Sequence, residues 1–299
     1  MPILKRITDS IFHVYERRNL TPWEHRPDTT LPIYGVYHAM LDTGWERLVG
    51  RQIDNLKKSG LLDATSTFYI SCIASNLQDV ERLRSMIDSD KTEIVSCLTD
   101  PKRYEYPALE FIKSLSERED CIVYYFHTKG ISYQSLDSSD QSFLSFRRKI
   151  EAWREMLEYF IFDKWQVAVN ALTNGYDTYG CYRWPPRNYT MYSGSFWWAR
   201  SEHIRQLPDF RPPVIATNRF YSETWLFERK HRQFSAFDSI ADLYFVRIPR
   251  SVYTDGTPCL RDKIGFSLMY NLRKIEKHIF HYNYKQRCQK KFQKLKQSI

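Results

Sequence analysis

Cys121-Ile-Val-Tyr-Tyr-Phe-His-Thr-Lys-Gly130 is the stretch that decides the fold of this chain. Its first six residues are mostly apolar and favour β-structure, and a run of that length predicts a strand buried on both faces. Gly130 is a natural end to the segment, since glycine adopts a positive φ at no steric cost. The stretch therefore predicts a central strand over 121–126 that ends in a polar turn.

His127 and Lys129 follow this strand directly. Ligands of open α/β sheets bind outside the carboxyl ends of the strands, and a neutral imidazole beside an ammonium suits an anion such as a diphosphate. The two side chains are two residues apart, so on an extended chain they point the same way. Taken alone, the stretch equally allows a strand that ends in an ordinary polar turn and binds nothing.

In the rest of residues 31–126, the spacing of the apolar residues alternates between that of a strand and that of a helix. Gly60 closes the first helix, as glycine commonly does after a last helical turn. Such alternation is typical of an α/β fold with a mainly parallel sheet and right-handed crossovers. The expected strands are 31–40, 67–75, 93–98 and 121–126, and the expected helices are 45–58, 77–87 and 106–118.

The pattern continues to about residue 260 and predicts three parts of the chain. Residues 1–30 form a lead-in with little core pattern, residues 31–260 an α/β domain, and residues 261–299 a basic helical tail. The elements expected after Gly130 are one long helix or two in series at 141–172, strands at 176–184 and 192–199, helices at 201–207 and 221–229, and strands and turns over 236–260 around Tyr244-Phe245-Val246.

Composition narrows the class of protein. Aromatic residues make up 16% of the 299 residues, which fits a surface that stacks on sugars and fits a thick core equally well. The six cysteines form no CxxC pair, which favours a reducing compartment without a zinc site or disulfide framework. No apolar run approaches the ~20 residues that span a bilayer, and the first residues lack the core of a signal peptide. A cytoplasmic protein is expected.

The net charge of +9 is concentrated at one end. Residues 273–299 hold nine Lys and Arg and one Glu, so they carry +8 of it. Apolar residues at three- and four-residue steps predict a basic amphipathic helix in two segments, first over 268–282 and then over 288–299. It either lies on the anionic inner leaflet, or its first segment packs on the domain and only the last turns are free. Both hold if 268–282 is docked and 285–299 lies on the membrane. A nucleic-acid partner is not expected, because the rest of the chain is nearly neutral.

Several common catalytic motifs are missing from the sequence. The absence of a Walker A loop, GxGxxG, GxSxG and HExxH argues against an NTPase, a Rossmann dehydrogenase, an α/β-hydrolase and a zincin. Two clusters remain beside the His127–Gly130 turn: Ser193-Gly194-Ser195 followed by Trp197-Trp198, and Arg219 followed by Glu223-x-Trp225. One tryptophan could form a sugar platform, or both could be core. Glu223 could be a partly buried general base or a solvated surface residue.

Taken together, these clusters resemble a bacterial glycosyltransferase group from O-antigen and capsule loci, of galactofuranosyltransferase type and GT-A architecture. The match covers about residues 31–230, and its motifs are moderately specific as a set and weak singly. One departure is Ser195, where the resemblance leads us to expect Asn. The matching segments are Tyr37-His38, Ser59-Gly60-Leu61, Tyr104-Glu105-Tyr106-Pro107, His127-Thr128-Lys129-Gly130, Gly194-x-Phe196-Trp197-Trp198-Ala199 and Arg219…Glu223-x-Trp225.

The resemblance implies a GT-A-like, Rossmann-like domain that binds a UDP-linked nucleotide-sugar donor, with UDP-galactofuranose as a candidate. Tyr37-His38 would hold the base or ribose, and Lys129 would supply positive charge to the diphosphate where typical members place a metal-binding Asp-x-Asp. A divalent metal is not expected to be required, although Asp100 or Asp137 could recruit Mg²⁺ or Mn²⁺. The implied donor-binding residues are Tyr37, His38, His127, Lys129, Gly130 and Arg154, the last beside Trp153 on the long helix.

The resemblance also implies a glycan or lipid-linked acceptor and an inverting reaction in surface polysaccharide synthesis, on the inner face of the plasma membrane. Glu223 would deprotonate the acceptor hydroxyl for direct displacement. The alternative is a non-catalytic domain on the same fold that binds carbohydrate or nucleotide. The implied acceptor-binding residues are Ser193, Gly194, Trp197, Arg219 and Trp225.

Overall fold

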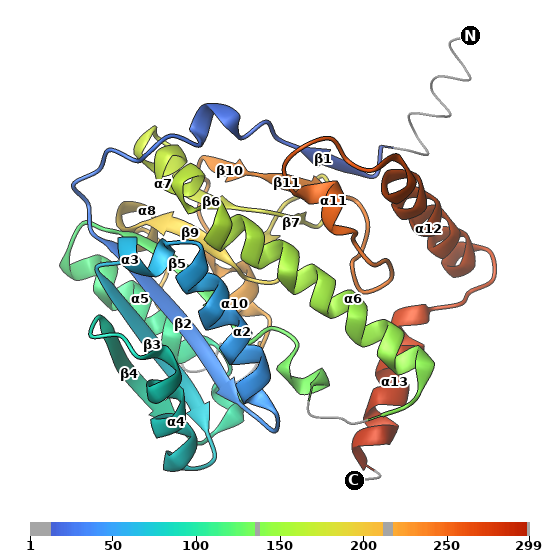
Figure 1. Cartoon of the computed structure of the whole chain (residues 1–299), viewed down its shortest axis with the longest axis horizontal. Helices are drawn as coiled ribbons and strands as arrows, with labels where there is room; N and C mark the ends of the chain where they lie inside the picture. The colour runs from blue at the N-terminus through green and yellow to red at the C-terminus, as the bar shows by residue number, and fades with distance from the viewer. Residues whose placement is uncertain (1–12, 135–137, 212–217, 298–299) are drawn as a thin grey trace.

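A computed structural model describes residues 13–134, 138–211 and 218–297 of the chain. Its centre is a seven-stranded sheet made of β2 (Ile33–Leu41), β3 (Thr67–Ala74), β4 (Thr92–Leu98), β5 (Ile122–His127), β6 (Thr178–Gly180), β9 (Trp197–Arg200) and β10 (Gln233–Ser235). The strands lie in the order β10-β6-β9-β5-β2-β3-β4 (Figure 1). Neighbours pair parallel except at β9, which runs antiparallel to both β5 and β6. The predicted mainly parallel α/β sheet is confirmed.

β5 lies in the middle of this sheet, between β9 and β2, as the opening stretch predicts. Its side chains alternate between two cores, one on each face. Ile122, Tyr124 and Phe126 join the larger core, while Val123 and Tyr125 join the smaller one. All five side chains are fully buried, so the prediction of a strand buried on both faces is confirmed.

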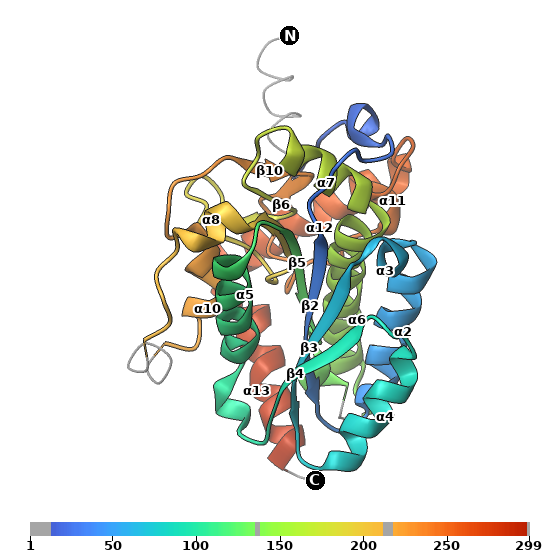
Figure 2. The same cartoon turned by 90° about the vertical axis from the view of Figure 1, so that its left-hand side faces the viewer.

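Helices cover both faces of the sheet and make a three-layer domain (Figure 2). α5 (Tyr106–Arg118) and the short α8 (Ser201–Arg205) contribute to the smaller core, and the helices on the opposite face contribute to the larger one. Pro107 stands in the first turn of α5, where a missing amide hydrogen costs nothing. The helices that contribute to the larger core include α2 (Trp45–Lys58), α3 (Leu61–Ala64), α4 (Leu77–Ile87), α6 (Gln141–Glu158) and α7 (Trp165–Thr173).

The long helix expected over 141–172 is two helices in series. α6 and α7 are separated by a π-helical turn, Tyr159–Asp163. The amide of Lys164 closes this turn by donating to the Tyr159 carbonyl at 3.1 Å. The side chains of Tyr159 to Phe162 are all buried, so the helical pitch changes where this segment packs into the core.

Two strands predicted after Gly175 are each divided in the structure. The 176–184 segment is β6 and β7 (Arg183–Trp184), with Tyr182 between them at φ +60°; the 192–199 segment is β8 (Met191–Tyr192) and β9. Gly194 and Ser195 separate the latter pair with φ values of +102° and +54°. A left-handed backbone cannot continue a strand, and it forms a sharp turn here instead.

Segments after residue 218 are less regular than predicted. The helix expected over 221–229 is α10 (Tyr221–Thr224) followed by a single 3₁₀ turn. Of the strands and turns expected here, Tyr244-Phe245-Val246 is a turn closed by Asp242. The Asp242 side chain accepts a hydrogen bond from the Tyr244 amide at 2.9 Å, and its carbonyl accepts from the amides of Phe245 at 2.9 Å and Val246 at 3.3 Å. The other short elements here are β11 (Phe237–Ser239) and α11 (Arg250–Tyr253).

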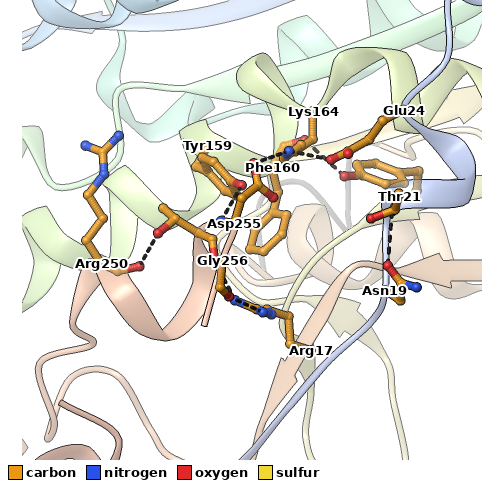
Figure 3. A network of polar contacts seen from close by, with 12 residues as sticks. Arg17, Asn19, Thr21, Glu24, Tyr159, Phe160, Lys164, Arg250, Asp255 and Gly256 are labelled. Carbon is orange, nitrogen blue, oxygen red and sulfur yellow. Dashed lines mark hydrogen bonds and ion pairs between the residues drawn. The ribbon is translucent and has the colours of Figure 1, made fainter. Parts of the chain in front are cut away.

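The described part of the lead-in is bound to the domain, contrary to the expectation of little core pattern. β1 (Tyr15–Arg17) pairs antiparallel with β11. Figure 3 shows the polar contacts that fix this segment. Arg17 donates to the Gly256 carbonyl at 2.6 Å, and Lys164 bridges Glu24 at 2.5 Å and Asp255 at 2.6 Å. Residues 13–30 therefore belong to the folded domain.

The C-terminal extension forms two helices as predicted, α12 (Leu260–His278) and α13 (Tyr284–Gln297). The expectation that only the first of the two segments docks on the domain is wrong. α13 is the docked segment: Tyr284 accepts a hydrogen bond from Lys149 of α6 at 2.8 Å, and Phe292 packs on Tyr133 with ring centroids 4.7 Å apart. Most of the apolar residues of α12 are exposed. No helix in the described residues is long and apolar enough to cross a bilayer.

Candidate active site

A pocket of about 220 Å³ opens where β5 ends. This is the edge of the sheet at which α/β proteins bind ligands, because the loops after parallel strands gather there. Its walls come from the loops after β4 and β5, the turn before β9, α6, α10 and α13. The lining residues are Glu105, His127, Lys129, Trp153, Tyr182, Trp184, Met191, Ser193, Gly194, Ser195, Phe220, Glu223, Asp242, Tyr244 and Lys285.

The His127–Gly130 turn is held in place from behind by its neighbours in the sheet and the helices. Thr128 is buried, and its hydroxyl accepts a hydrogen bond from the Met40 amide at 2.9 Å. Gln52 of α2 donates to the His127 carbonyl at 3.2 Å, and Arg154 of α6 donates to the Lys129 carbonyl at 3.3 Å. These bonds occupy the backbone of the turn and leave the His127 and Lys129 side chains to line the pocket.

His127 is a neutral imidazole that connects two walls of the pocket. Its Nε2 lies 2.9 Å from the Gly194 carbonyl, and a carbonyl only accepts, so Nε2 carries the hydrogen. Its Nδ1 then faces Glu105 Oε1 at 3.6 Å. Burial lowers the pKa of His127 to about 4, and the ammonium of Lys129 adds to the effect.

Lys129 lies against an aromatic wall. Its Nζ is 3.8 Å from the centroid of the Trp153 ring, a cation–π contact. Gly194 makes room for it, since a Cβ there would stand 3.2 Å from Lys129 Cε and 2.6 Å from Leu157 Cδ1. Burial lowers the pKa of Lys129 to about 8; Glu223 and Glu105 act in the opposite direction, and the positive charge of Lys285 acts in the same one. Two cations therefore share the pocket.

Two carboxyl groups face these cations. Burial raises the pKa of Glu105 to about 7, although the positive charges of Lys129 and Arg219 partly offset it. Burial also raises the pKa of Glu223, with Lys129 opposing and the negative charge of Glu105 adding to the rise. Carboxyl groups with raised pKa values suit proton transfer, and groups with perturbed pKa values concentrate at functional sites.

The walls also hold polar atoms that the protein leaves unpaired. Trp153 Nε1, Ser195 Oγ and Glu105 Oε2 are buried and have no hydrogen-bond partner within the described ranges. Trp153 and Ser195 are each only 3% exposed. Folded proteins pair nearly all buried polar atoms, so three unpaired ones around one pocket point to a polar ligand. Left-handed backbone at Tyr104, φ +45°, and at Ser195 adds local strain of the kind found at binding sites.

Five of the site residues predicted from the sequence line the pocket together: His127, Lys129, Ser193, Gly194 and Glu223. They come from β5, the turn before β9 and α10, which are far apart in the sequence. The structure thus brings the three predicted clusters to one place. The roles assigned to these residues stay predictions.

The other predicted donor residues lie behind the turn and not in the pocket lining. Tyr37 is buried, and its hydroxyl donates to Gln52 Oε1 at 2.8 Å, so it supports the bond from Gln52 to the turn. Arg154 is buried and pairs with Glu158 at 3.3 Å. His38 lies beside His127 in the sheet, and burial lowers its pKa to about 3.

Gly130 also belongs to this supporting layer. Its φ is +84°, and a Cβ there would stand 2.7 Å from Ile150 Cγ2, so any larger residue would force the Ile150 side chain of α6 to shift. Glycine is needed at this position for the backbone.

The remaining predicted acceptor residues do not line the pocket either. Trp197 is buried against Tyr125, with ring centroids 5.2 Å apart. Trp225 is buried and donates from its indole to the Pro208 carbonyl at 2.8 Å. Arg219 is exposed and lies over the Phe220 ring at 5.0 Å. Sequence alternation correctly predicted that Trp197 and Trp198 face opposite ways, but both sides are core.

Sequence reasoning gave no role to several lining residues. Glu105 was noticed only as part of a motif, and the signal for it was its place just before the first turn of α5. Asp242, Tyr244 and Lys285 carry no local signal. Lys285 reaches the pocket because α13 docks on α6, and its Nζ lies 3.9 Å from Asp242 Oδ2 and 4.1 Å from the Tyr244 ring centroid.

The residues suggested for metal recruitment give no cluster. In the described part of the chain, no group of three or more His, Cys, Asp or Glu could hold a metal ion. Asp100 is exposed and accepts the Lys102 amide at 2.9 Å as a helix cap. Asp137 lies outside the described residues. The positive charge of the pocket itself comes from lysine.

No protein-family model matches the chain, and no curated protein matches it. Among solved structures it is similar to a mannosyltransferase from Pyrobaculum calidifontis in complex with GDP-Man and Mn²⁺, with a TM-score of 0.39, 13% identity, and coverage of 83% of this chain and 72% of that chain. It is also similar to 4-diphosphocytidyl-2C-methyl-D-erythritol synthase from Anaerococcus prevotii, with a TM-score of 0.34, 9% identity, and coverage of 80% and 97%. Both TM-scores lie below 0.5, and the functional proposal therefore rests on the pocket.

Proposed function

We propose that the chain is a glycosyltransferase that moves a sugar from a nucleotide-sugar donor to a hydroxyl of a glycan or lipid-linked acceptor. The observation that carries the proposal is the composition of the pocket. Two lysines and two carboxyl groups with raised pKa values meet at the carboxyl end of the central strand. The lysines suit a diphosphate, and the carboxyl groups suit the proton of the attacking hydroxyl.

The proposed anion site consists of Lys129 and Lys285. Burial lowers the pKa of Lys129 most, and repulsion from the positive charge of Lys285 lowers it further. A diphosphate between them would remove that repulsion and would also receive the negative charge of the broken bond. In this proposal, the two ammonium groups take the role that a divalent metal has in many diphosphate sites, and a UDP-linked sugar is the first donor to test.

The proposed base is Glu223. The acceptor oxygen attacks the anomeric carbon, the bond from that carbon to the diphosphate oxygen breaks, and the hydroxyl proton moves to Glu223. The nucleoside diphosphate leaves, and the anomeric configuration inverts. Burial raises the pKa of Glu223, which makes its carboxylate a stronger base.

Glu105 is the competing candidate for the base. It also lines the pocket, and its pKa of about 7 suits proton transfer at neutral pH. However, its contact with His127 Nδ1 places Glu105 on the donor side of the pocket. Glu223 lies on α10 beside Phe220, which also lines the pocket. Phe220, Tyr182, Trp184 and Tyr244 would form the aromatic wall for the acceptor sugar.

The test is a pair of matched variants, Glu223→Gln and Glu105→Gln. A screen of nucleotide sugars for protection against thermal unfolding first identifies the donor. Glu223→Gln should then lose turnover by about 10²–10⁴-fold, the contribution of a positioned base, while it keeps donor affinity. Loss of turnover in Glu105→Gln alone would move the base to Glu105. A protein that binds donor but transfers no sugar to any acceptor would be a binding domain instead.

The identity of the donor sugar and the cellular role of the chain are also proposals. The motif resemblance supports UDP-galactofuranose as a donor to test early, and supports a role in O-antigen or capsule synthesis at the inner face of the plasma membrane. A comparison of free oligosaccharides with the same oligosaccharides on a lipid diphosphate would test the acceptor. Retained anomeric configuration in the product would rule out direct displacement.

A further inference from the structure

A second cavity, of about 210 Å³, lies between α12 and the domain. Its volume is close to that of the candidate active-site pocket. The residues of α12 that line it recur at three- and four-residue steps and so lie on one face of the helix. They are Tyr270, Arg273, Lys274, Lys277 and His278. None of them lines the active-site pocket, so the second cavity is a separate feature.

The α12 wall of the second cavity is cationic. Lys274 and Lys277 are exposed and have no ion-pair partner among the residues that the structure describes; Lys277 Nζ lies 6.0 Å from the centroid of the Phe245 ring. Arg273 pairs with Glu276 at 2.6 Å, but its Nε is buried and lacks a hydrogen-bond partner within the same residues. Folded proteins pair nearly all buried donors, so this one points to a ligand oxygen.

Acidic residues do little to offset this positive charge. Asp242 is the only Asp or Glu among the described residues that line the second cavity. Its side chain accepts the Tyr244 amide at 2.9 Å and lies 3.9 Å from Lys285 Nζ, and both of these partners line the active-site pocket. The second cavity thus keeps an excess of positive charge. Two unpaired lysines match a diphosphate, with a charge on each phosphorus group, better than they match a single carboxylate.

The remaining lining of the second cavity is apolar or aromatic. It consists of Trp184, Ile240, Phe245 and Val246. A free inorganic anion has no use for such a surface, whereas a diphosphate ester has carbon groups beside its charges. Aromatic rings also suit the face of a sugar. The lining therefore fits a diphosphate ester.

The second cavity adjoins the active-site pocket. Trp184 and Asp242 line both of them. A sugar in the active-site pocket could therefore be continuous with a charged group in the second cavity.

We propose that the second cavity is an acceptor subsite, which binds the diphosphate of a lipid-linked acceptor next to its reacting sugar. This inference rests on the proposed transferase function, in which Trp184 is part of the wall for the acceptor sugar. Lys274 and Lys277 bind the two phosphate groups, and Arg273 Nε donates to a phosphate oxygen. The apolar residues contact the first carbons of the lipid. The diphosphate of the donor stays at its own site in the active-site pocket.

Calorimetric titration of the full chain with decyl diphosphate tests the subsite without any transfer reaction. The test variant is Lys274→Met/Lys277→Met. The matched control is Arg261→Met/Lys263→Met, which removes the same charge from exposed residues of α12 that line neither cavity. Thermal unfolding first checks that both variants are folded. The wild type and the control should bind equally, and the test variant at least about tenfold more weakly, because it loses two charged contacts.

Three results of this titration would overturn the proposal. The first is a wild type that does not bind decyl diphosphate, and the second is equal affinity in the wild type and the test variant. The third is loss of all binding in Lys129→Met, because the probe would then occupy the active-site pocket. Methyl diphosphate separates a lipid-linked diphosphate from a free one. It has the same charge without the chain and should bind at least about tenfold more weakly, and equal affinity would overturn the lipid-linked assignment.

Transfer assays distinguish a failure of this subsite from a failure of the proposed function. The preference for a glycan on a lipid diphosphate over the same free glycan, measured as a ratio of kcat/KM values, should fall at least about tenfold in Lys274→Met/Lys277→Met and stay constant in the control. Sugar transfer with an unchanged preference would refute the subsite alone. Binding of decyl diphosphate through these lysines without transfer to any acceptor would refute the proposed function and support the diphosphate site.

Discussion

Replacing Glu105 with glutamine measures how strongly the pocket disfavours a carboxylate. The pKa of Glu105 is raised from 4.5 to about 7, with burial as the largest cause. Between these two values the folded protein binds more protons than the unfolded chain, so stability falls as pH rises through this range. Below the range the carboxyl group is neutral in both states. Above it, the folded state carries the full cost of the buried charge.

The size of the effect follows from the two pKa values. A separation from 4.5 to about 7, at about 1.36 kcal/mol per pH unit, corresponds to about 3 kcal/mol. Glutamine resembles the neutral carboxyl group at every pH. Glu105→Gln should therefore match the wild type near pH 4 and exceed its free energy of unfolding by about 2–3 kcal/mol at pH 8.

Urea unfolding of the wild type and the variant at several pH values between 4 and 8.5 provides the measurement. Ser195→Ala is the control, since it removes a buried polar atom from the same pocket without removing a titratable group. Its difference from the wild type should be nearly constant with pH. If the Glu105→Gln difference is equally flat, the Glu105 carboxyl group is not buried as described, and the electrostatic argument for the pocket fails.

Four further predictions follow from the same structure. Lys129→Met should weaken UDP binding by about 1.5–3 kcal/mol in calorimetry, as expected for a lost charge-assisted contact; unchanged affinity would remove Lys129 from the donor site. UDP binding should take up protons between pH 7 and 8, since a nearby anion raises the pKa values of Lys129 and Glu105 from about 8 and about 7; equal heats in two buffers of different ionisation enthalpy would contradict this. Gly194→Ala should lower the free energy of unfolding by about 1–3 kcal/mol because φ is +102° there; a neutral effect would mean that the turn relaxes. Lys164→Met should cost about 1–2 kcal/mol and release the lead-in to proteolysis, because two partly exposed acids lose their partner; unchanged protection would show that β1 holds the segment alone.

Elements with an unambiguous apolar period were predictable from the sequence. β5 and α5 fall where the pattern places them, since a short apolar run between polar turns, or a helix with proline in its first turn, has few alternatives. The turn before β9 was missed because it needs a left-handed backbone at Ser195, and serine gives no signal of that conformation. The order of the helices and strands was thus predictable from the sequence, whereas the breaks within the aromatic segments were not.

Burial of aromatic residues was the main limit in predicting the site. Tyr37, Trp197 and Trp225 have the chemistry of ligand contacts, but in this structure they fill the core around the pocket. Nothing local distinguishes an aromatic residue that lines a cleft from one that supports it. Lys285 shows the opposite case: it lines the pocket only because α13 packs on α6, and the sequence pattern favoured a free tail instead.

The charges of the pocket suggest an order of events in the proposed reaction. Without a ligand, Lys129 favours the carboxylate form of Glu223 and so lowers its pKa. A diphosphate at Lys129 and Lys285 would neutralise that influence, and the pKa of Glu223 would rise. Glu223 would therefore become a stronger base when the donor is in place, provided that it is still ionised. The acceptor hydroxyl would then lose its proton only beside a bound donor, and loss of the nucleoside diphosphate would return Glu223 to its weaker state. A pH profile of kcat/KM for the acceptor at saturating donor should accordingly show an acid limb at higher pH than the pKa of Glu223 in the free protein. An acid limb at or below that pKa would show that a bound donor does not raise the pKa of the base.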